Sequence, residues 1–296
     1  MQGIINVLKP AGMTSHDVIY VLRKIYGIRK MGHSGTLDPL AAGVLPVFLG
    51  KATRLLAWAP TEPKVYLAEW LVGIATDTED TSGTIVQQMS AIPKLTAEQL
   101  ETAAALFRGT ILQRPSQYSA IKVDGRKAYE LARKNQKVEL PAREITIHEF
   151  TDISYQLPYL RARVVCSQGT YIRALGRDFG EALGVPLTMS FLVREQVGNF
   201  TLEDAWTLEE IRAAKEAALR PATDAVRHLP QYRVPTAAAE RFRHGQTIRG
   251  TISDVTALWC DEQFIGLGKP AEEGGIRPYK VLSLIHISEP TRLLSI

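Results

Sequence analysis

A glycine-rich stretch, GHSGTLDPLAAGVLP at residues 32–46, holds the first side chains that could do chemistry. Its one carboxylate, Asp38, could act as a nucleophile or stabilise a cation. Asp38 precedes a proline, which keeps it out of the α-helical region, and an aspartate in that place is most often a turn former. The stretch lacks the GxxxxGK[ST] phosphate loop and the GxSxG nucleophile elbow. Spacing alone therefore predicts an ordered loop with one carboxylate, flanked by His33, Ser34 and Thr36.

The elements that would position this loop have the sequence patterns of helices and of strands. Capping boxes begin helices at Thr14 and Thr96, and a third capped helix is expected in TLEEIRAAKEAAL. KVYLAEWLVGI and YLRARVVCSQG have the composition or alternation of strands, and an apolar stripe after Gly169 predicts another helix ending at Gly184. Without a strict βαβ rhythm, this mixture predicts an α+β core with a mixed, largely antiparallel sheet flanked by helices. Residues 31–50 are expected to form a long ordered loop.

The charge distribution points towards a polyanion. The chain has 296 residues and a formal net charge of +4. Residues 1–54 carry seven basic and two acidic side chains, and residues 105–140 carry eight basic and three acidic ones. Two basic blocks in an otherwise balanced chain indicate a nucleic-acid surface, although solvated helix faces remain an alternative.

Several classes of protein are not indicated. The sequence has no long apolar stretch of membrane-spanning length and no secretory leader pattern. The two cysteines, Cys166 and Cys260, are far apart, and the histidines have no metal-ligand spacing. We therefore expect a cytoplasmic protein without a disulfide framework, metal or membrane partner.

The C-terminal part differs in composition from the rest. Prolines and polar residues cluster around 221–235, and short apolar runs follow. We expect a catalytic domain over 1–225 and a small β-barrel module over 230–282. Residues 283–296 are expected to belong to no fold, because LSLIHISEPTR resembles the translation of a sequencing adapter.

Six motifs follow one another along the chain: INVLKPAGMTS, KMGHSGTLDPLAAGVLPVFLGKATRL, KVYLAEWLVGIATDTED, FRGTILQRPSQYSAIKVDGRKAYELAR, SQGTYIRALGRDFGEALG and FLVRE. This series resembles the TruB family of bacterial tRNA pseudouridine synthases. It covers nearly all of residues 3–210, departing at Ser34 and Ala42, where threonine is common. The C-terminal RHGQTIRG and FIGLGKPAEEGGIRPYKVL resemble the PUA module of these enzymes, which implies a barrel that holds the acceptor end of tRNA.

The resemblance implies an isomerase that converts uridine 55 of the tRNA T loop into pseudouridine, as a monomer and without a cofactor. It assigns the catalytic aspartate to Asp38, the tyrosine that stacks on the target base to Tyr66, and the arginine that pairs with the aspartate to Arg173. The substrate-binding positions that it implies are His33, which fills the space left by the flipped uridine, Leu192 under the base, Lys9 and Pro10 beside the site, and Thr36 in its loop.

Other readings of the same residues stay open without the resemblance. Tyr66 would be an ordinary strand aromatic, Arg173 a surface residue near a helix start, and His33 a loop hydrogen-bonder. Cys166 is expected to be a strand residue of the hydrophobic core. Two rival functions remain: a tRNA-binding or RNA-folding module without catalysis, and a guide-RNA-dependent enzyme acting on ribosomal RNA, which would need partner-binding extensions.

Overall fold

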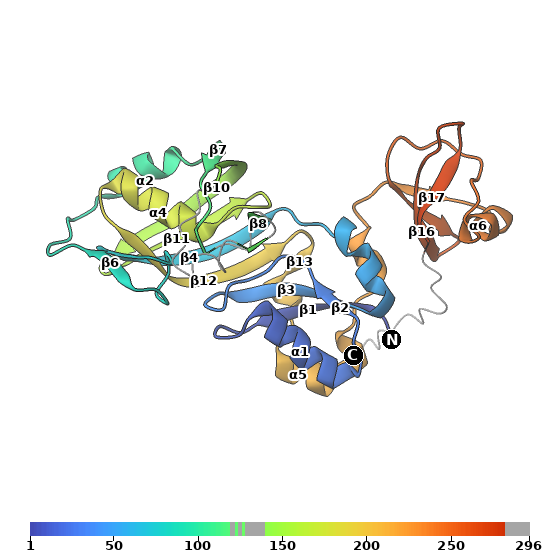
Figure 1. Cartoon of the computed structure of the whole chain (residues 1–296), viewed down its shortest axis with the longest axis horizontal. Helices are drawn as coiled ribbons and strands as arrows, with labels where there is room; N and C mark the ends of the chain where they lie inside the picture. The colour runs from blue at the N-terminus through green and yellow to red at the C-terminus, as the bar shows by residue number, and fades with distance from the viewer. Residues whose placement is uncertain (119–121, 124–125, 128–139, 282–296) are drawn as a thin grey trace, which may run out of the picture.

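A nine-stranded mixed sheet forms the centre of the computed structural model, which describes residues 1–118, 122–123, 126–127 and 140–281 (Figure 1). The strands follow the order β1-β3-β12-β4-β11-β10-β7, with β13 on β12 and β2 on β3. Every pairing is antiparallel except that of β12 with β3. The bounds are β1 Gly3–Lys9, β2 Met31–His33, β3 Ala42–Leu49, β4 Lys64–Val72, β7 Gly109–Gln113, β10 Arg143–Gln156, β11 Tyr159–Cys166, β12 Leu187–Val197 and β13 Phe200–Thr201.

Four α-helices of the described residues flank this sheet. The helices α2 and α4 pack on its β4–β11–β10 half, and α1 and α5 pack on its β1–β3 half (Figure 1). The predicted capping boxes are present at the starts of α1 and α2, where Thr14 and Thr96 each accept a hydrogen bond from the third backbone N–H of the helix. The bounds are α1 Ser15–Tyr26, α2 Ala97–Ala105, α4 Ile172–Leu183 and α5 Leu208–Ala214.

Short elements complete this part of the chain. The hairpin of β5 with β6 and the small pair of β8 with β9 lie outside the large sheet. The described residues also form four 3-10 helices. The bounds are β5 Ile74–Thr76, β6 Ile85–Gln88, β8 Lys122–Val123, β9 Arg126–Lys127, η1 Gly50–Trp58, η2 Leu202–Asp204, η3 Lys215–Ala218 and η4 Ala222–Ala225.

Two predicted elements differ from the structure. The stretch 31–50 is not one long loop, because β2 and β3 occupy its ends and only residues 34–41 remain as loop. The buried run from Val44 to Leu49 pairs with β1. This pairing provides hydrogen-bond partners for its backbone, although the run contains Pro46 and follows Gly43. The helix expected in TLEEIRAAKEAAL is shorter than predicted, because Lys215 has a positive φ of 46° and ends α5.

A close approach fixes α4 on the sheet. A Cβ atom at Gly176 would lie 2.0 Å from the indole nitrogen of Trp70, so only glycine allows the helix to come this near to β4. Trp70 also makes an edge-to-face contact with Phe179, one turn further along α4. This packing holds the start of α4, and therefore Arg173, over the middle of the sheet.

The C-terminal module consists of one helix and a four-stranded sheet in the order β14-β15-β16-β17. An isolated bridge between Ile248 and Ile276 adds a further segment beside β17. Residues 283–296 lie outside the described part of the chain, so the expected tail is not described. The bounds are β14 Gln231–Arg233, α6 Thr236–Arg243, β15 Thr256–Cys260, β16 Gln263–Pro270 and β17 Ile276–Val281.

Candidate active site

A cavity of about 250 Å³ lies between the 34–41 loop, β4, β12 and the start of α4. It brings together five of the residues singled out in the sequence. They come from positions up to 156 residues apart, so the sheet and not the local sequence assembles them. The residues in question are Thr36, Asp38, Tyr66, Arg173 and Leu192.

The closest polar contact in this cavity joins Asp38 to Arg173. The Arg173 Nε lies 2.9 Å from Asp38 Oδ2. The arginine side chain is 6% exposed and the aspartate side chain is 39% exposed, so the carboxylate remains open to a ligand while its partner is buried.

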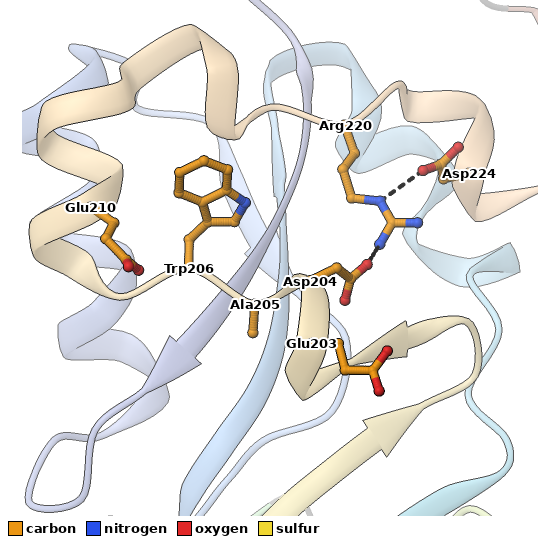
Figure 2. A pocket seen from close by; sticks show the side chains of 7 residues that line it. All are labelled: Glu203, Asp204, Ala205, Trp206, Glu210, Arg220 and Asp224. Carbon is orange, nitrogen blue, oxygen red and sulfur yellow. Dashed lines mark hydrogen bonds and ion pairs between the residues drawn. The ribbon is translucent and has the colours of Figure 1, made fainter. Parts of the chain in front are cut away.

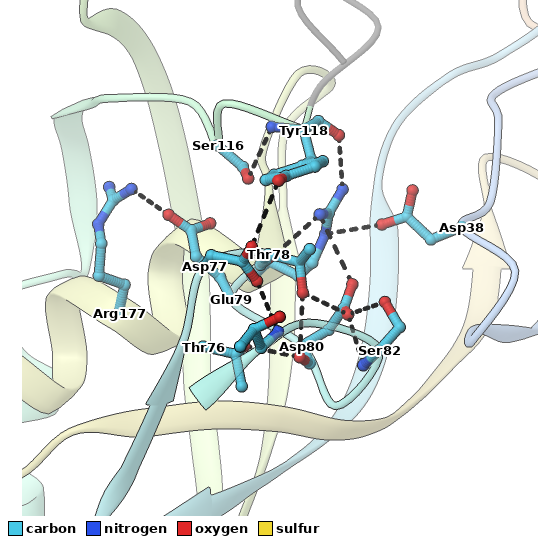
Figure 3. Close-up of polar contacts among 12 residues, drawn as sticks. Asp38, Thr76, Asp77, Thr78, Glu79, Asp80, Ser82, Ser116, Tyr118 and Arg177 are labelled. Carbon is cyan, nitrogen blue, oxygen red and sulfur yellow. Dashed lines mark hydrogen bonds and ion pairs between the residues drawn. The ribbon is translucent and has the colours of Figure 1, made fainter. Parts of the chain in front are cut away.

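The rest of the Arg173 guanidinium is also occupied (Figure 3). Nη1 donates to the Thr78 carbonyl and Nη2 to the Tyr118 carbonyl, each at 3.1 Å. Nη1 also lies 3.6 Å from Oδ2 of the buried Asp80. These contacts fix the plane of the guanidinium, so that its Nε edge points at Asp38.

Neighbouring residues of the turn that follows β5 hold the Asp80 carboxylate in place (Figure 3). Its Oδ1 accepts hydrogen bonds from the Thr78 hydroxyl at 2.9 Å, from the Ser82 N–H at 3.0 Å and from the Ser82 hydroxyl. Asp80 was not among the residues predicted for the site from the sequence. The dense hydroxyl and carboxylate composition of the turn was the available signal.

Tyr66 and Leu192 line the cavity from the neighbouring strands β4 and β12. Tyr66 lies on β4, is 6% exposed and faces the buried Arg194 of β12 in the strand pairing. Burial raises the pKa of the Tyr66 hydroxyl, and the positive charge of Arg194 acts in the opposite direction. Leu192 lies on β12, next to β4, and is 5% exposed. The pair offers an aromatic and an aliphatic surface to a planar ligand.

Three other predicted residues do not line the cavity. His33 lies in β2, where burial lowers its pKa, and its buried Nδ1 has no hydrogen-bond partner among the residues that the structure describes. Pro10 is exposed. Lys9 is buried behind the 34–41 loop, where its Nζ donates to the carbonyls of Met13 at 2.5 Å and Pro39 at 3.4 Å.

Sequence reasoning also missed two basic residues of the site, Lys64 and Arg194. Lys64 lines the cavity, and burial lowers its pKa. Both residues lie two positions from a predicted one on the same strand, Lys64 before Tyr66 and Arg194 after Leu192. Side chains two apart on a strand share a face, so the alternation could have revealed them.

A larger hollow of about 610 Å³ lies elsewhere and has a different character (Figure 2). It is lined by Trp206 and by side chains that are mainly acidic. Arg220 spans it, with ion pairs to Asp204 and to Asp224, the latter at 2.8 Å. None of the residues predicted for the site lies here, and its acidic lining would repel a polyanion. The smaller cavity is therefore the candidate active site.

The described part of the chain contains no group of three or more His, Cys, Asp or Glu side chains placed to hold a metal ion. None of its helices is long and apolar enough to cross a membrane. Its two cysteines, including Cys166 in the core of β11 as expected, are buried and unpaired.

Comparison with known proteins assigns the family. Residues 23–172 match the TruB family pseudouridylate synthase N-terminal domain, and residues 230–282 match the C-terminal domain described as pseudouridine synthase II TruB, C-terminal. The proteins called tRNA pseudouridine synthase B of Moorella thermoacetica and Caldanaerobacter subterraneus are 43% and 44% identical to this chain. Each alignment covers 95% of this chain and 99% of the relative.

Solved structures agree with this assignment. A structure of an H/ACA RNP bound to a substrate RNA containing 2'-deoxyuridine has a TM-score of 0.71 and 26% identity, covering 94% of this chain and 84% of the other. A Cbf5-Nop10-Gar1 complex has a TM-score of 0.72 and 27% identity, with the same coverage. The fold is thus that of the pseudouridine synthase class, with an α+β core around a mixed sheet. Within that class, the chain belongs to the TruB family.

The environment of Lys9 gives a prediction about pH. Burial lowers the pKa of Lys9 from 10.5 to about 8, with Asp38 partly opposing this. The unfolded chain then holds a proton between about pH 8 and 10.5 that the folded chain has lost, so Lys9 makes stability rise with pH across that window. We expect the free energy of unfolding of the wild type, relative to Lys9→Met, to increase between pH 7 and pH 10.

Urea unfolding of both proteins at each pH measures this difference. Asp17→Asn serves as a control, because it removes a nearby exposed charge and leaves Lys9 in place. A wild-type curve that stays parallel to that of Lys9→Met over the whole range would contradict the lowered pKa.

Proposed function

We propose that this chain isomerises uridine to pseudouridine at position 55 in the T loop of tRNA. The observation that carries the proposal is the Asp38–Arg173 ion pair of 2.9 Å at a cavity walled by Tyr66 and Leu192. The names of the similar proteins, tRNA pseudouridine synthase B, supply the substrate.

Asp38 is the proposed catalytic carboxylate. The reaction breaks the N1 glycosidic bond, rotates the base and rejoins it to the same ribose through C5. A carboxylate can attack the ring or the ribose, or stabilise the cation that develops when the bond breaks. Arg173 supports each of these roles, because its permanent positive charge lies beside the carboxylate. No redox or hydrolytic step is involved, so we propose neither a metal nor a cofactor.

Tyr66 and Leu192 are the proposed holders of the flipped base. Taking a base out of its stack costs a few kcal/mol, and stacking on an aromatic side chain returns roughly 1–3 kcal/mol. Tyr66 provides such a surface, and Leu192 supplies an apolar contact from the neighbouring strand. Thr36 lines the same cavity from the loop that carries Asp38.

Lys9, Pro10 and His33 have a supporting place in the proposal. Lys9 holds the Pro39 carbonyl, and so the loop that carries Asp38, through the 3.4 Å contact of its Nζ. Pro10 follows it in the chain and is exposed to an approaching RNA. His33 stands outside the cavity, which suits the proposal that it fills the space left in the T loop by the flipped uridine.

We further infer the organisation of the molecule. The proposed catalytic domain spans 1–225, and 230–282 forms a PUA-like barrel that holds the acceptor end of the tRNA. The bridge between Ile248 and Ile276 supports closure beside β17. We propose that the enzyme acts in the cytoplasm as a monomer on the T-arm.

Two rival functions are less well supported. A binding module without catalysis would not require the Asp38–Arg173 ion pair in the cavity proposed to hold the flipped base. A guide-RNA-dependent enzyme is suggested by the likeness to H/ACA proteins, but their identity of 26–27% is well below the 43–44% of the tRNA-enzyme relatives.

The decisive assay is pseudouridine formation on an unmodified T-arm stem-loop. We expect the wild-type chain to form product and Asp38→Asn to form none, because the amide can neither attack nor carry the negative charge. Mass spectrometry after carbodiimide labelling measures the product. RNA binding by Asp38→Asn serves as the control for folding, and undiminished product from this variant would sink the assignment.

The Tyr66 hydroxyl is tested separately from its ring. Tyr66→Phe keeps the stacking surface, so we expect binding within about threefold of the wild type and turnover slower by about 10²-fold or more, the usual range for a lost proton-transfer group. Single-turnover kinetics with excess enzyme measures both quantities. Normal turnover would remove the hydroxyl from the chemistry.

Salt dependence tests the basic block of residues 1–54. We expect T-arm binding to weaken by roughly tenfold or more between 50 and 200 mM salt, because phosphate contacts release counterions. Exchanging the exposed Arg29 and Lys30 for glutamine should flatten the slope of log affinity against log salt by up to about 2. Arg212→Gln, an exposed change on α5, is the control. Equal slopes in all three proteins would exclude Arg29 and Lys30 from the RNA surface.

A further inference from the structure

The backbone on both sides of Asp38 is tied to the segment where α1 begins. After Asp38, the Pro39 carbonyl accepts a hydrogen bond from the Gly12 N–H at 2.8 Å. Before Asp38, the main chain of Leu37 bonds to the side chain of Ser15. The loop that carries the proposed catalytic carboxylate is therefore held at both neighbours of that residue.

The Ser15 hydroxyl makes two of these contacts at once. It accepts a hydrogen bond from the Leu37 N–H at 2.9 Å and donates one to the Leu37 carbonyl at 3.1 Å. A hydroxyl has a single proton to donate, so this pairing commits the Ser15 proton to the Leu37 carbonyl. One side chain thus provides partners for both polar groups of a main-chain residue, as a neighbouring β-strand would.

Burial makes the loop sensitive to these two bonds. Ser15 and Leu37 are each only 3% exposed, so water has little access to the groups that they join. A buried backbone N–H or carbonyl that loses its partner costs free energy. Without the hydroxyl, the Leu37 main chain would have to shift in order to regain hydrogen bonds, and Asp38 would move with it.

Ser15 itself has a fixed position. It is the first residue of α1, directly after the Thr14 capping box, in which the Asp17 N–H donates to Thr14 Oγ1 at 3.0 Å and the Thr14 N–H donates to Asp17 Oδ2 at 2.9 Å. Further along the helix, Val18 and Leu22 are fully buried in a cluster with residues of β1 and β3. The Ser15 hydroxyl therefore fixes Leu37 relative to the β1–β3 half of the sheet.

Asp38 lies between this anchor and Arg173. The carboxylate meets Arg173 Nε at 2.9 Å, and Arg173 belongs to α4 on the other half of the sheet. The backbone of Asp38 is thus held from one half of the domain and its side chain faces the other. A displacement of about 1 Å at a reacting group can cost a reaction about 10²-fold. The Leu37 backbone is adjacent to Asp38 and would pass such a displacement on to it.

We propose that Ser15 is a positioning residue for Asp38: through the main chain of Leu37, its hydroxyl sets where the carboxylate meets Arg173 and the flipped uridine. The inference rests on the proposed function, in which Asp38 is the catalytic carboxylate. It adds the side chain that fixes the backbone of this residue from behind.

Single-turnover kinetics on the T-arm stem-loop tests the proposal. We expect Ser15→Ala to lower the maximal rate by about 10–100-fold, while the enzyme concentration for half-maximal rate stays within about threefold of the wild type, because RNA binding does not need the hydroxyl. Ser15→Thr keeps the hydroxyl and should restore the rate to within about fivefold. An undiminished rate in Ser15→Ala, or an equal loss in Ser15→Thr, would overturn the proposal.

Thr96→Ala is the matched control for stability. It also removes a hydroxyl that accepts a backbone hydrogen bond at the start of a helix, but this helix is α2 and the Thr96 hydroxyl has no bond to the 34–41 loop. We expect this variant to be less stable than the wild type and to keep its maximal rate within about twofold. A loss of rate as large as that of Ser15→Ala would contradict the proposal, because it would attribute the effect to stability alone.

A spectroscopic measurement reports the position of the carboxylate without turnover. The nitrogen-15 Nε signal of Arg173, assigned by its absence from Arg173→Lys, depends on the ion pair with Asp38. In Ser15→Ala we expect this signal to move towards its position in Asp38→Ala, and in Thr96→Ala we expect it to stay in place. An unmoved signal in Ser15→Ala would show that the hydroxyl does not position Asp38.

A last measurement needs no substitution, in case the Ser15 variants do not fold. Hydrogen exchange of the Leu37 amide in the wild type should be slowed to the level of the central strands, and exchange at the rate of an unprotected loop amide would overturn the inference. Failure of the proposed function would appear differently, as absence of pseudouridine from the wild-type reaction.

Discussion

A buried guanidinium is the constraint on which the site depends. Arg173 is nearly inaccessible to solvent and is held through Thr78, Asp80 and Tyr118, while its Nε faces Asp38. Because a planar fork has few orientations that satisfy every donor, the position of one side chain determines where the turn after β5, the segment after β7 and the 34–41 loop can lie. The sheet provides the frame, and Arg173 joins the loops across it.

Local features of the fold were predictable, because they depend on neighbours in sequence. Both capping boxes and α1 follow from Thr14 and Thr96 with their partners three residues later. The strands β2 and β3 were missed, because their stability comes from pairing with β1 and burial of Val44–Leu49, which no local pattern of glycine and proline reveals. The early end of α5 depends on the positive φ of Lys215, which composition does not encode.

The site was predictable only in part. The residues around Asp38 indicated only a turn former. The family resemblance of the motif series assigned Arg173 and Tyr66 as its partners. Asp80 and Arg194 were not foreseen, because their roles arise from contacts between segments about 90 and 160 residues apart. The one local sign of Arg194 is its place two residues after Leu192, on the same face of the strand.

The C-terminal module is joined to the large domain by more than a linker. Ala52 and Leu55 of η1 share a buried cluster with Phe264 and Leu267 of β16, and the Trp58 ring meets Tyr279 edge to face at 5.4 Å. Cutting the chain between them would leave apolar surface on both pieces facing water. The two parts should therefore melt in a single calorimetric transition, and a fragment lacking the module should be prone to aggregate.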